Sequence, residues 1–328
     1  MKSVIMAGGL GTRLRPLTNV VPKHALPVFG KPMIEYVIES MVSGGFNDII
    51  LTTGHIYDKI VEVVGDATQY GAKAVYSIES RPLGTAGSVK RVQAFLDDTF
   101  VVGSGDVLAD VDIKELYKFH KKKGAIATMA LTEVENPTEY GIVGLDDDGK
   151  IVKFKEKPLE YEVFSNLINA GIYVLEPEAL NYVPEETMFD FSKNLFPVLL
   201  EKGVLYGKPI KGLWRDVGRP ADLIGAHIDV GERKGSVLKG YHEGANIDGV
   251  CYIAESAVVE EGATVVNSFI YGGAVVKRGA YVENSIVFDG SVVEENVVLK
   301  NSIVFWNTFL NPDETYEYQI ITPPGVGE

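Results

Sequence analysis

The chain has 328 residues, of which 46% are hydrophobic, a size and composition typical of about two domains with substantial cores. A formal net charge of −14 argues against a general nucleic-acid-binding protein, which would present a basic face. The sequence shows neither a membrane-spanning apolar stretch nor a signal peptide, and its single cysteine, Cys251, excludes a disulfide framework and a cysteine-rich zinc site. These features predict a cytoplasmic protein with no membrane or nucleic-acid partner.

In roughly the first 235 residues, strand-like apolar runs alternate with amphipathic stretches of helical period. The pattern predicts strands at 3–6, 48–53, 72–78, 100–106, 125–134, 150–157 and 170–176. It predicts helices at 33–45, 56–65, 84–96, 113–124, near 190–202 and at 218–233. Pro220 fits the first turn of the last helix. Such alternation indicates right-handed crossovers, so we expect an α/β fold with a Rossmann-like, mostly parallel sheet flanked by helices.

Beyond the last of these helices the period changes. Three consecutive segments align in a 17-residue register, namely 263–279, 280–296 and 297–313. Apolar residues recur at steps of six, six and five from Val259 to Val304, and Asn-Ser recurs once in each segment. This near-hexapeptide spacing predicts a left-handed parallel β-helix, a small solenoid suited to docking or homo-oligomerisation. The expected domains are an α/β domain at 1–235, the β-helix at 236–313 and an extended tail at 314–328.

Residues 6–17 read MAGGLGTRLRPL and place Gly8, Gly9 and Gly11 directly after the first predicted strand. Glycines there serve either a tight strand-to-helix turn or a cradle whose bare N–H groups reach phosphate oxygens. A dinucleotide-binding fingerprint fails because position 14 is leucine. A Walker A loop fails because no Gly-Lys pair is followed by Ser or Thr. The residues of this stretch alone leave the turn and the cradle open.

The longer string MAGGLGTRLRPLTNVVPKHALPVFGKPMI resembles the signature of the sugar-1-phosphate nucleotidyltransferases, also called NDP-sugar pyrophosphorylases. Four further motifs resemble this family in its order: YGIV at 140–143, FKEKP at 154–158, NAGIYVLEPEAL at 169–180 and WRDVGRPADL at 214–223. A β-helix tail is also common in the family. The resemblance implies an enzyme that joins a nucleoside triphosphate to a hexose 1-phosphate and releases pyrophosphate.

The resemblance also implies a role for each residue that matches a motif. It assigns nucleotide binding to the loop residues Ala7, Gly8, Gly9, Gly11, Thr12 and Arg13. Arg13 offers the phosphates a planar fork, whereas Lys23 offers them a point charge that can follow a moving group. The implied catalytic set is Arg13, Lys23, Asp106, Lys157 and Asp216.

Two aspartates are candidates for a metal site. Asp106 ends a predicted strand, and a carboxylate at the C-terminal end of a parallel strand faces the ligand crevice of such a sheet. Asp216 ends a later apolar run. Two carboxylates with substrate phosphates suit Mg²⁺, which takes hard oxygen ligands, and the resemblance assigns both residues to it. Taken singly, Asp106 could instead cap a turn, and Asp216 could pair with Arg215 or Arg219.

FKEKP places Glu156 and Lys157 at a strand end, where alternation would point their side chains to opposite sides. Such a pair is commonly a solvated charge run. The resemblance implies that Glu156 accepts hydrogen bonds from sugar hydroxyls and that Lys157 neutralises the sugar phosphate. It adds sugar contacts from Asn169 and the backbone of Gly141, while a structural role for Asn169 stays open.

The stretch IESRPLGTAGSV at 78–89 lies where the family reads the base. PLGTAG is most similar to GDP-mannose pyrophosphorylases and brings Gly84 and Thr85 to the nucleotide, whereas PKHALPVFGKPMI is about as close to thymidylyltransferases. The carboxylate of Glu79 matches the adjacent N1–H and N2 donors of guanine, and an amide would suit thymine or uracil better. We expect GTP and mannose 1-phosphate. The alternatives are a thymidylyl- or uridylyltransferase, with Glu79 a plain surface acid.

Two rivals come from other classes of protein. Left-handed β-helices also carry acyltransferases, which need a histidine within the coils, and the repeats from residue 263 onward contain none. Regulatory homologues without activity tend to lose the catalytic set, which is intact here.

Overall fold

The computed structural model describes residues 1–54 and 56–326. They divide into two compact units, each assembled from two stretches of chain. The first unit contains Met1–Gly9 and Met33–Trp214, and the second contains Leu10–Pro32 and Arg215–Glu328. The glycine-rich stretch therefore contributes to both units, because Gly8 and Gly9 close one segment and Gly11 lies in the other.

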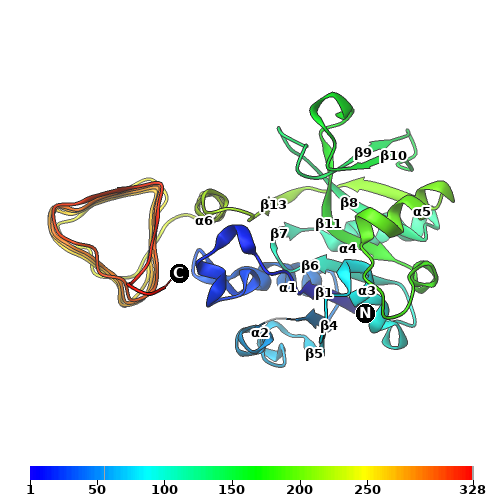
Figure 1. Cartoon of the computed structure of the whole chain (residues 1–328), viewed down its shortest axis with the longest axis horizontal. Helices are drawn as coiled ribbons and strands as arrows, with labels where there is room; N and C mark the ends of the chain where they lie inside the picture. Colours follow the sequence, from blue (N-terminus) through cyan, green and yellow to red (C-terminus); the bar gives the residue numbers. More distant parts are fainter. Residues whose placement is uncertain (55, 327–328) are drawn as a thin grey trace. The chain divides into compact units, whose positions relative to one another are not determined.

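The first unit is built on a nine-stranded sheet (Figure 1). Four of its strands run parallel in the order β6–β1–β4–β5, with bounds Phe100–Ser104, Lys2–Ala7, Asp48–Thr53 and Lys73–Ile78. β1 is buried along nearly its whole length, as expected for a central parallel strand that is covered on both faces. This part of the sheet confirms the predicted α/β fold.

An antiparallel part extends the sheet beyond β6. Its central strand, β11 (Leu167–Leu175), runs antiparallel to β6, β8 and β9. The other strands of this part are β8 (Ala127–Glu133), β9 (Gly141–Leu145), β10 (Ile151–Glu156) and β12 (Leu205–Pro209), of which β12 pairs parallel with β8. Outside the large sheet lie the short strands β7 (Val107–Val111) and β13 (Gly212–Asp216). The repeating strand–helix pattern did not predict β7, β9, β12 and β13.

The helices confirm the predicted positions, with shorter bounds. The α-helices are α1 (Met33–Ser43), α2 (Tyr57–Val64), α3 (Gly84–Arg91), α4 (Ile113–Lys123), α5 (Phe196–Glu201) and α6 (Pro220–Lys234). The helix predicted to end at 96 stops at Arg91, and a 3₁₀ turn, η5 (Gln93–Phe95), follows it. A π-helical turn, η8 (Phe191–Leu195), leads into α5. The remaining 3₁₀ turns are η1 (Thr12–Leu14), η2 (Leu17–Asn19), η3 (Lys23–Ala25), η4 (Thr68–Tyr70), η6 (Glu160–Glu162) and η7 (Pro177–Tyr182).

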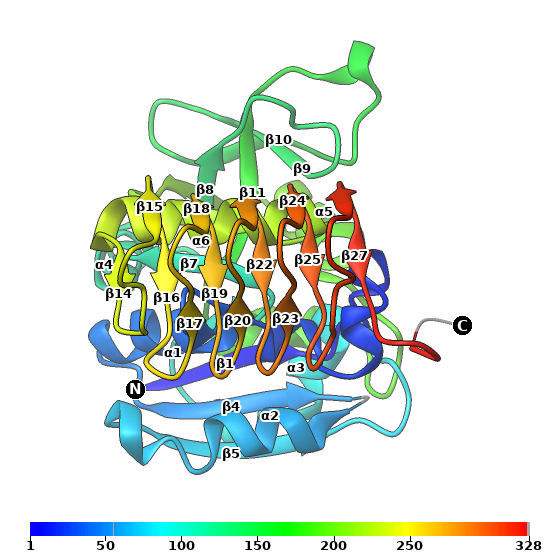
Figure 2. The same ribbon diagram turned by 90° about the vertical axis from the view of Figure 1, so that its left-hand side faces the viewer.

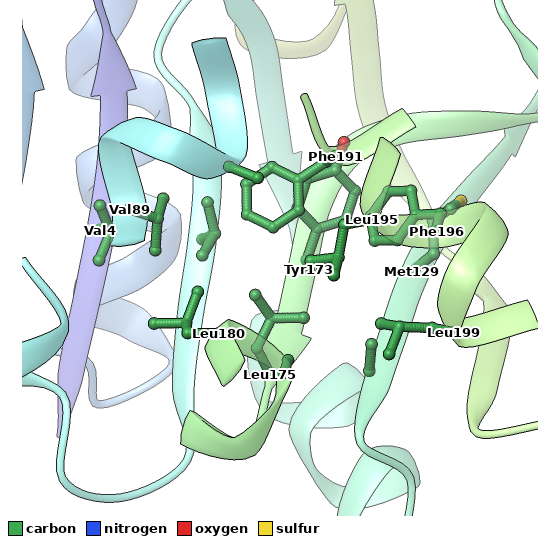
Figure 3. Close-up of a cluster of buried hydrophobic side chains, with 14 of the residues drawn as sticks. Val4, Val89, Met129, Tyr173, Leu175, Leu180, Phe191, Leu195, Phe196 and Leu199 are labelled. Carbon is green, nitrogen blue, oxygen red and sulfur yellow. The ribbon is translucent and has the colours of Figure 1, made fainter. Parts of the chain in front are cut away.

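A hydrophobic cluster packs between the sheet and the segments η8 and α5 (Figure 3). Tyr173 on β11 is nearly fully buried, with its ring centroid 4.9 Å from that of Phe196. Phe191 stacks on Phe196 at 5.6 Å. Val4 of β1 and Val89 of α3 extend the same cluster to the parallel strands. The cluster fixes the segment around residue 190 against the sheet.

The second unit contains the β-helix, whose stacked coils have a triangular outline in Figure 1. Parallel pairing joins residues 17 apart, as in Val258 with Val275 and Val275 with Val292. Inward side chains such as Val276, Val282 and Val287 are fully buried, which confirms the repeat read from the sequence. Figure 2 shows β16, β19, β22, β25 and β27 side by side, and β27 (Ile320–Ile321) carries the stack past residue 313.

The short strands of the second unit form four sheets. A hairpin in the N-terminal stretch pairs β2 (Pro27–Val28) with β3 (Lys31–Pro32). The sheets of the β-helix contain β14 (Val237–Leu238), β15 (Asn246–Asp248), β16 (Tyr252–Ile253), β17 (Val258–Val259), β18 (Thr264–Val266), β19 (Phe269–Ile270), β20 (Val275–Val276), β21 (Tyr281–Glu283), β22 (Ile286–Val287), β23 (Val292–Val293), β24 (Val298–Lys300), β25 (Ile303–Val304), β26 (Thr315–Glu317) and β27.

The repeated Asn-Ser pair builds the same corner of three successive coils, at residues 267–268, 284–285 and 301–302. Asn284 adopts a left-handed backbone with φ of 45°, which asparagine tolerates better than most residues. The next residue, Ser285, is fully buried and donates its hydroxyl to Glu283 O at 2.7 Å. The same hydroxyl accepts the N–H of Ser302 in the following coil at 3.1 Å. Serine therefore links successive coils where a buried N–H would otherwise lack a partner.

Candidate functional site

The first half of the glycine-rich loop lies at the carboxyl end of β1. Ala7 ends the strand and is buried, whereas Gly8 and Gly9 are exposed. Gly8 does not have a positive φ, and a Cβ built on it would meet no atom within 4 Å. Neither backbone conformation nor packing demands glycine at this position. The missing side chain leaves open space beside backbone N–H groups, as a phosphate cradle requires.

Gly11 has a different reason to be glycine. Its φ is 58°, and a Cβ there would lie 2.9 Å from Thr18 Cγ2. Thr18 donates its hydroxyl to Gly11 O at 2.9 Å, which fixes the turn that begins η1. Thr12, the first residue of η1, is exposed. The turn therefore requires glycine at position 11 but not at position 8, and the phosphate cradle stays a prediction.

A charged cluster forms within the second unit. The side chain of Lys23 is only 6% exposed, and its Nζ lies 3.2 Å from Asp216 Oδ1. Arg13 NH2 lies 4.0 Å from Asp216 Oδ2. Two cations thus approach the two oxygens of one carboxylate, which places three of the five predicted catalytic residues together.

A glycine and a second ion pair flank Arg13 and Asp216 of this cluster. A Cβ on Gly218 would lie 2.8 Å from Arg13 NH2, so the guanidinium lies close against the bare backbone. Arg215 binds Asp229 through two hydrogen bonds, from Nε at 2.5 Å and from NH2 at 3.1 Å. Arg215 thus pairs with Asp229, whereas Lys23 and Arg13 lie beside Asp216.

Asp106 lies in the turn that follows β6 in the first unit. Its Oδ1 accepts the hydroxyl of Ser104 at 2.5 Å, and the carboxylate is partly exposed. The N–H of Gly105 binds Met6 O at 2.9 Å, which ties this turn to the end of β1. Asp106 is thus held at the carboxyl end of the parallel strands, as predicted.

Both aspartates offer partly exposed oxygen ligands, which is the donor chemistry that suits Mg²⁺. Within residues 1–54 and 56–326, no group of three or more His, Cys, Asp or Glu side chains is arranged to hold a metal ion. Binding of Mg²⁺ by Asp106 and Asp216 stays a prediction.

Glu156 ends β10 and is half-buried beside Gly141 of β9. A Cβ on Gly141 would lie 2.7 Å from Glu156 Oε2, so glycine makes room for the carboxylate. Burial raises the pKa of Glu156, opposed by the charges of Lys157 and Lys193 and by a hydrogen bond from Ser192. Lys157 is exposed with φ of 46°, so the strand alternation predicted for the pair stops at Glu156.

Asn169 lies on β11 within a hydrogen-bonded network. Its Nδ2 donates to Tyr173 Oη at 3.0 Å and to Ser192 Oγ at 3.1 Å, and its Oδ1 accepts the N–H of Gly171 at 2.9 Å. These bonds give Asn169 the structural role that the sequence left open. They also place it next to Ser192, the hydrogen-bond donor to Glu156.

One turn contains Glu79, Gly84 and Thr85. It packs against a segment that is distant in the sequence. Glu79 is half-buried, and its Oε2 accepts the N–H of Leu83 at 3.3 Å. Burial raises its pKa, opposed by the Leu83 N–H and by the charge of Arg91. A Cβ on Gly84, whose φ is 71°, would lie 2.8 Å from the carbonyl oxygen of Phe189.

Thr85 is tied to the same distant segment. Its N–H and hydroxyl donate to Asp190 Oδ1 at 3.1 and 3.3 Å, and its hydroxyl accepts the N–H of Phe191 at 2.9 Å. The N–H groups of Ala86 and Gly87 both bind Phe189 O at 2.9 Å. The glycines of PLGTAG therefore allow α3 to pack closely on residues 187–190, a role that sequence reasoning missed.

Sequence reasoning also missed Asp190, Ser192 and Lys193. They contact or face two of the predicted site residues. Asp190 accepts the N–H of Thr85. Burial raises the pKa of Glu156, and Ser192 and Lys193 act to lower it, by a hydrogen bond and by charge. Short polar residues at a helix start are common throughout proteins, so nothing in the local sequence distinguishes them. The family-like motifs end at 180 and resume at 214, which left this segment without a signal.

Comparison with protein families assigns both parts of the chain. Residues 2–233 match the family described as Nucleotidyl transferase, and residues 247–318 match the GMPPB C-terminal domain. A structure described as a glucose-1-phosphate thymidylyltransferase from Bacillus anthracis is similar with a TM-score of 0.64 and 28% identity. The similarity covers 69% of this chain and 94% of that one.

Curated relatives carry two activities in their names. A UTP–glucose-1-phosphate uridylyltransferase of Synechocystis is 34% identical over 83% of this chain and 78% of its own length. Mannose-1-phosphate guanyltransferases of Aspergillus oryzae and Saccharomyces cerevisiae are 39% and 37% identical over 68% and 70% of this chain. The matched parts span less than two thirds of these two relatives, at 62% and 64%. With its loop, its charged cluster and its β-helix, the chain belongs to the nucleotidyl transferase family and carries a C-terminal domain of the GMPPB type.

Proposed function

We propose that the chain is a sugar-1-phosphate nucleotidyltransferase that makes GDP-mannose and pyrophosphate from GTP and mannose 1-phosphate. The observation that carries the proposal is the cluster of Lys23, Arg13 and Asp216, in which a nearly buried ammonium and a guanidinium flank one carboxylate. The match of residues 2–233 to the nucleotidyl transferase family supports a role for this cluster in binding phosphates. Other residues support the assignments of the sugar 1-phosphate and of the base.

The reaction needs charge compensation more than proton transfer. A phosphate monoester has a second pKa near ~6, so the attacking phosphate is already ionised at neutral pH. No general base is needed, whereas two polyanions must meet in line at the α-phosphorus. Lys23 supplies a point charge at the reacting centre, and Arg13 stabilises the departing pyrophosphate with its planar fork.

Mg²⁺ held by Asp106 and Asp216 would add positive charge at the α-phosphate. Both side chains provide the hard, partly exposed oxygen ligands that this ion takes. Because Lys23 and Arg13 flank Asp216, they keep its carboxylate oriented while phosphate oxygens approach. The open space beside Gly8 lets backbone N–H groups contact the same phosphates.

The sugar phosphate is assigned to Glu156 and Lys157. The carboxylate of Glu156 is held by Ser192 in the niche left by Gly141, ready to accept sugar hydroxyls. Lys157 is exposed in a left-handed backbone conformation, which is uncommon for lysine and marks a constrained position. Its ammonium would neutralise the attacking phosphate. Asn169 contributes by fixing Ser192.

GTP is favoured by Glu79 and by the mannose-1-phosphate guanyltransferases among the relatives. The carboxylate of Glu79 can accept the N1–H and N2 donors of guanine together. A uridylyltransferase acting on glucose 1-phosphate is the second candidate, because the Synechocystis relative aligns over 83% of this chain. We also propose that the chain forms a homo-oligomer through its β-helix, and a mass measurement in solution tests this.

One experiment separates these activities. Pyrophosphate release is measured over a matrix of four nucleoside triphosphates and the 1-phosphates of mannose, glucose and N-acetylglucosamine, with and without Mg²⁺. We expect the highest kcat/KM for GTP with mannose 1-phosphate and activity that needs Mg²⁺. Higher kcat/KM for UTP with glucose 1-phosphate would support the second candidate. Turnover of acetyl-CoA without pyrophosphate release, or inactivity on every pair, would contradict the proposal.

A further inference from the structure

The hairpin that follows Lys23 has an unusual turn. Val28 pairs with Lys31, and the two residues between them, Phe29 and Gly30, have φ of 49° and 82°. A two-residue turn with two left-handed residues is the type I′ turn, which prefers Asn or Gly at its first position. Phenylalanine is strained there, and such strain persists only where the surroundings impose it.

Those surroundings are the first coils of the β-helix and helix α6. The ring of Phe29 is buried, with its centroid 5.5 Å from that of Tyr252 and 6.1 Å from that of Phe269. A Cβ on Gly30 would lie 2.6 Å from Tyr252 Oη, so the turn lies against that ring. On α6, a Cβ on Gly231 would lie 2.8 Å from the Phe29 ring. The aromatic contacts offset the strain of the turn.

A directed chain of hydrogen bonds connects the same three elements. His227 Nδ1 lies 2.7 Å from Leu223 O, which can only accept, so Nδ1 carries the proton. Burial lowers the pKa of His227 to about 4, so the ring is neutral and its Nε2 accepts. Tyr271 Oη lies 2.7 Å from Nε2 and donates to it, and in turn accepts the N–H of Gly30 at 3.3 Å. Each hydrogen bond in this series therefore has one possible donor and one possible acceptor.

The anchored elements carry the two charged groups of the site. β2 begins four residues after Lys23, and α6 begins four residues after Asp216. Joining the hairpin to α6 through Tyr271 therefore constrains where Lys23 Nζ lies relative to Asp216 Oδ1. We propose that Tyr271, a residue of the β-helix, is a positioning residue for Lys23, so that the β-helix helps to build the phosphate site. This inference rests on the proposed function for its catalytic consequence.

The test compares Tyr271→Phe with Tyr281→Phe in the full chain. Tyr271→Phe keeps the ring contacts with Tyr252, Phe288 and His227 and removes only the hydroxyl. Tyr281 lies on β21 of the same β-helix, where its ring faces Lys300, and serves as the matched control. Two readouts are taken: steady-state kinetics with the best substrate pair, and amide hydrogen exchange of the segment 23–30.

We expect Tyr271→Phe to lower kcat about 10-fold, since small misplacements of a catalytic group are costly. The KM for the sugar 1-phosphate should stay within about twofold, because Glu156 and Lys157 are not anchored by Tyr271. Exchange at Leu26 and Gly30 should be faster than in the unmodified protein, and Tyr281→Phe should change neither readout.

Unchanged exchange in Tyr271→Phe would overturn the anchoring. Faster exchange with unchanged kcat would overturn the positioning role, as would a loss carried by KM for the sugar 1-phosphate. An unmodified protein that transfers no nucleotide at all is a failure of the proposed function instead. In that case the exchange readout still decides whether Tyr271 holds the hairpin.

Discussion

The ammonium of Lys23 and the carboxylate of Asp216 lie 3.2 Å apart within one compact unit, although 193 residues separate them in the chain. The pair is held from both sides, because Lys23 precedes the β2–β3 hairpin and Asp216 precedes α6. Arg13 completes the cluster from the opposite oxygen of the same carboxylate. The chain therefore gathers its cations locally despite a net charge of −14.

Replacing Lys23 with methionine tests the role of this ammonium. Lys23→Met keeps the length and apolar stem of the side chain and removes the charge that faces Asp216. We expect kcat to fall about 10²–10³-fold, the usual loss when one charge-stabilising group is removed. Pyrophosphate release measures the loss, and thermal unfolding shows whether the fold survives.

Lys59→Met is the control for Lys23→Met. Lys59 is an exposed residue of α2 whose Nζ lies 2.7 Å from Glu62 Oε2, and such surface pairs contribute little to stability. We expect this variant to retain full activity. A Lys23→Met protein that stays folded and keeps most of its activity would rule out the proposed charge compensation.

Base preference can be tested at Glu79. Glu79→Gln replaces an acceptor-only group with an amide that donates and accepts, which suits uracil or thymine better than guanine. The amide oxygen can still accept the Leu83 N–H, so the local turn should persist. We expect the ratio of kcat/KM for GTP to that for UTP to fall about 10-fold or more, on the scale of 1–3 kcal/mol for one base contact. An unchanged ratio would mean that Glu79 only supports the turn.

The β-helix and the parallel strands could be predicted from the sequence because their signals are local and repeated. Asn-Ser recurs every 17 residues, and each copy has a physical task in the same corner of a coil. β1 shows a buried apolar run that ends in glycines. The local sequence of each such element is enough to predict it without knowledge of its tertiary contacts.

The missed features depend on partners that are distant in the chain. Gly84 is glycine because Phe189, more than a hundred residues later, lies against it. The strand β9 pairs with β10 and β11, and β12 pairs with β8, so both strands depend on partners elsewhere in the chain. Phe29 occupies a turn position that local preference would give to Asn or Gly, and its contacts with the β-helix and α6 explain it. Sequence patterns do not record such long-range contacts.

The serine ladder of the β-helix should contribute measurably to stability. Ser285→Ala leaves the N–H of Ser302 without its acceptor inside the coil, where an unsatisfied buried group costs about 1–3 kcal/mol. Ser256→Ala is the matched control, since Ser256 accepts the N–H of Gly273 at 3.0 Å but is exposed, so water can replace it. We expect Ser256→Ala to change the free energy of unfolding by less than about 0.5 kcal/mol. Equal losses for both variants in denaturant unfolding would contradict the ladder argument.

We expect the ionised carboxylate of Glu156, a proposed binding residue, to lower the free energy of unfolding of the protein. Its pKa is raised by burial, so ionising it costs folding free energy as the pH rises above the value of an unfolded glutamate. Glu156→Gln removes that cost, and we expect a higher melting temperature at pH 8 and little difference at about pH 3, below the pKa of an unfolded glutamate, where the carboxyl is protonated in both the folded and the unfolded state. The same variant should weaken sugar 1-phosphate binding, because glutamine accepts fewer hydrogen bonds from hydroxyls.

Glu162→Gln is a control for Glu156→Gln, because its effect on stability is expected to have the opposite sign. The pKa of Glu162 is lowered by the N–H of Leu159 and by Lys155, so its ionised form stabilises the fold above the pKa of an unfolded glutamate. We expect Glu162→Gln to lower the melting temperature at pH 8, with the difference vanishing as the pH falls through the folded pKa. Melting curves of both variants from pH 2 to 8, a range that extends below the pKa of an unfolded glutamate, check the two signs together. A Glu156→Gln protein that is less stable at pH 8 would show that the carboxylate is held by its partners more strongly than burial disfavours it.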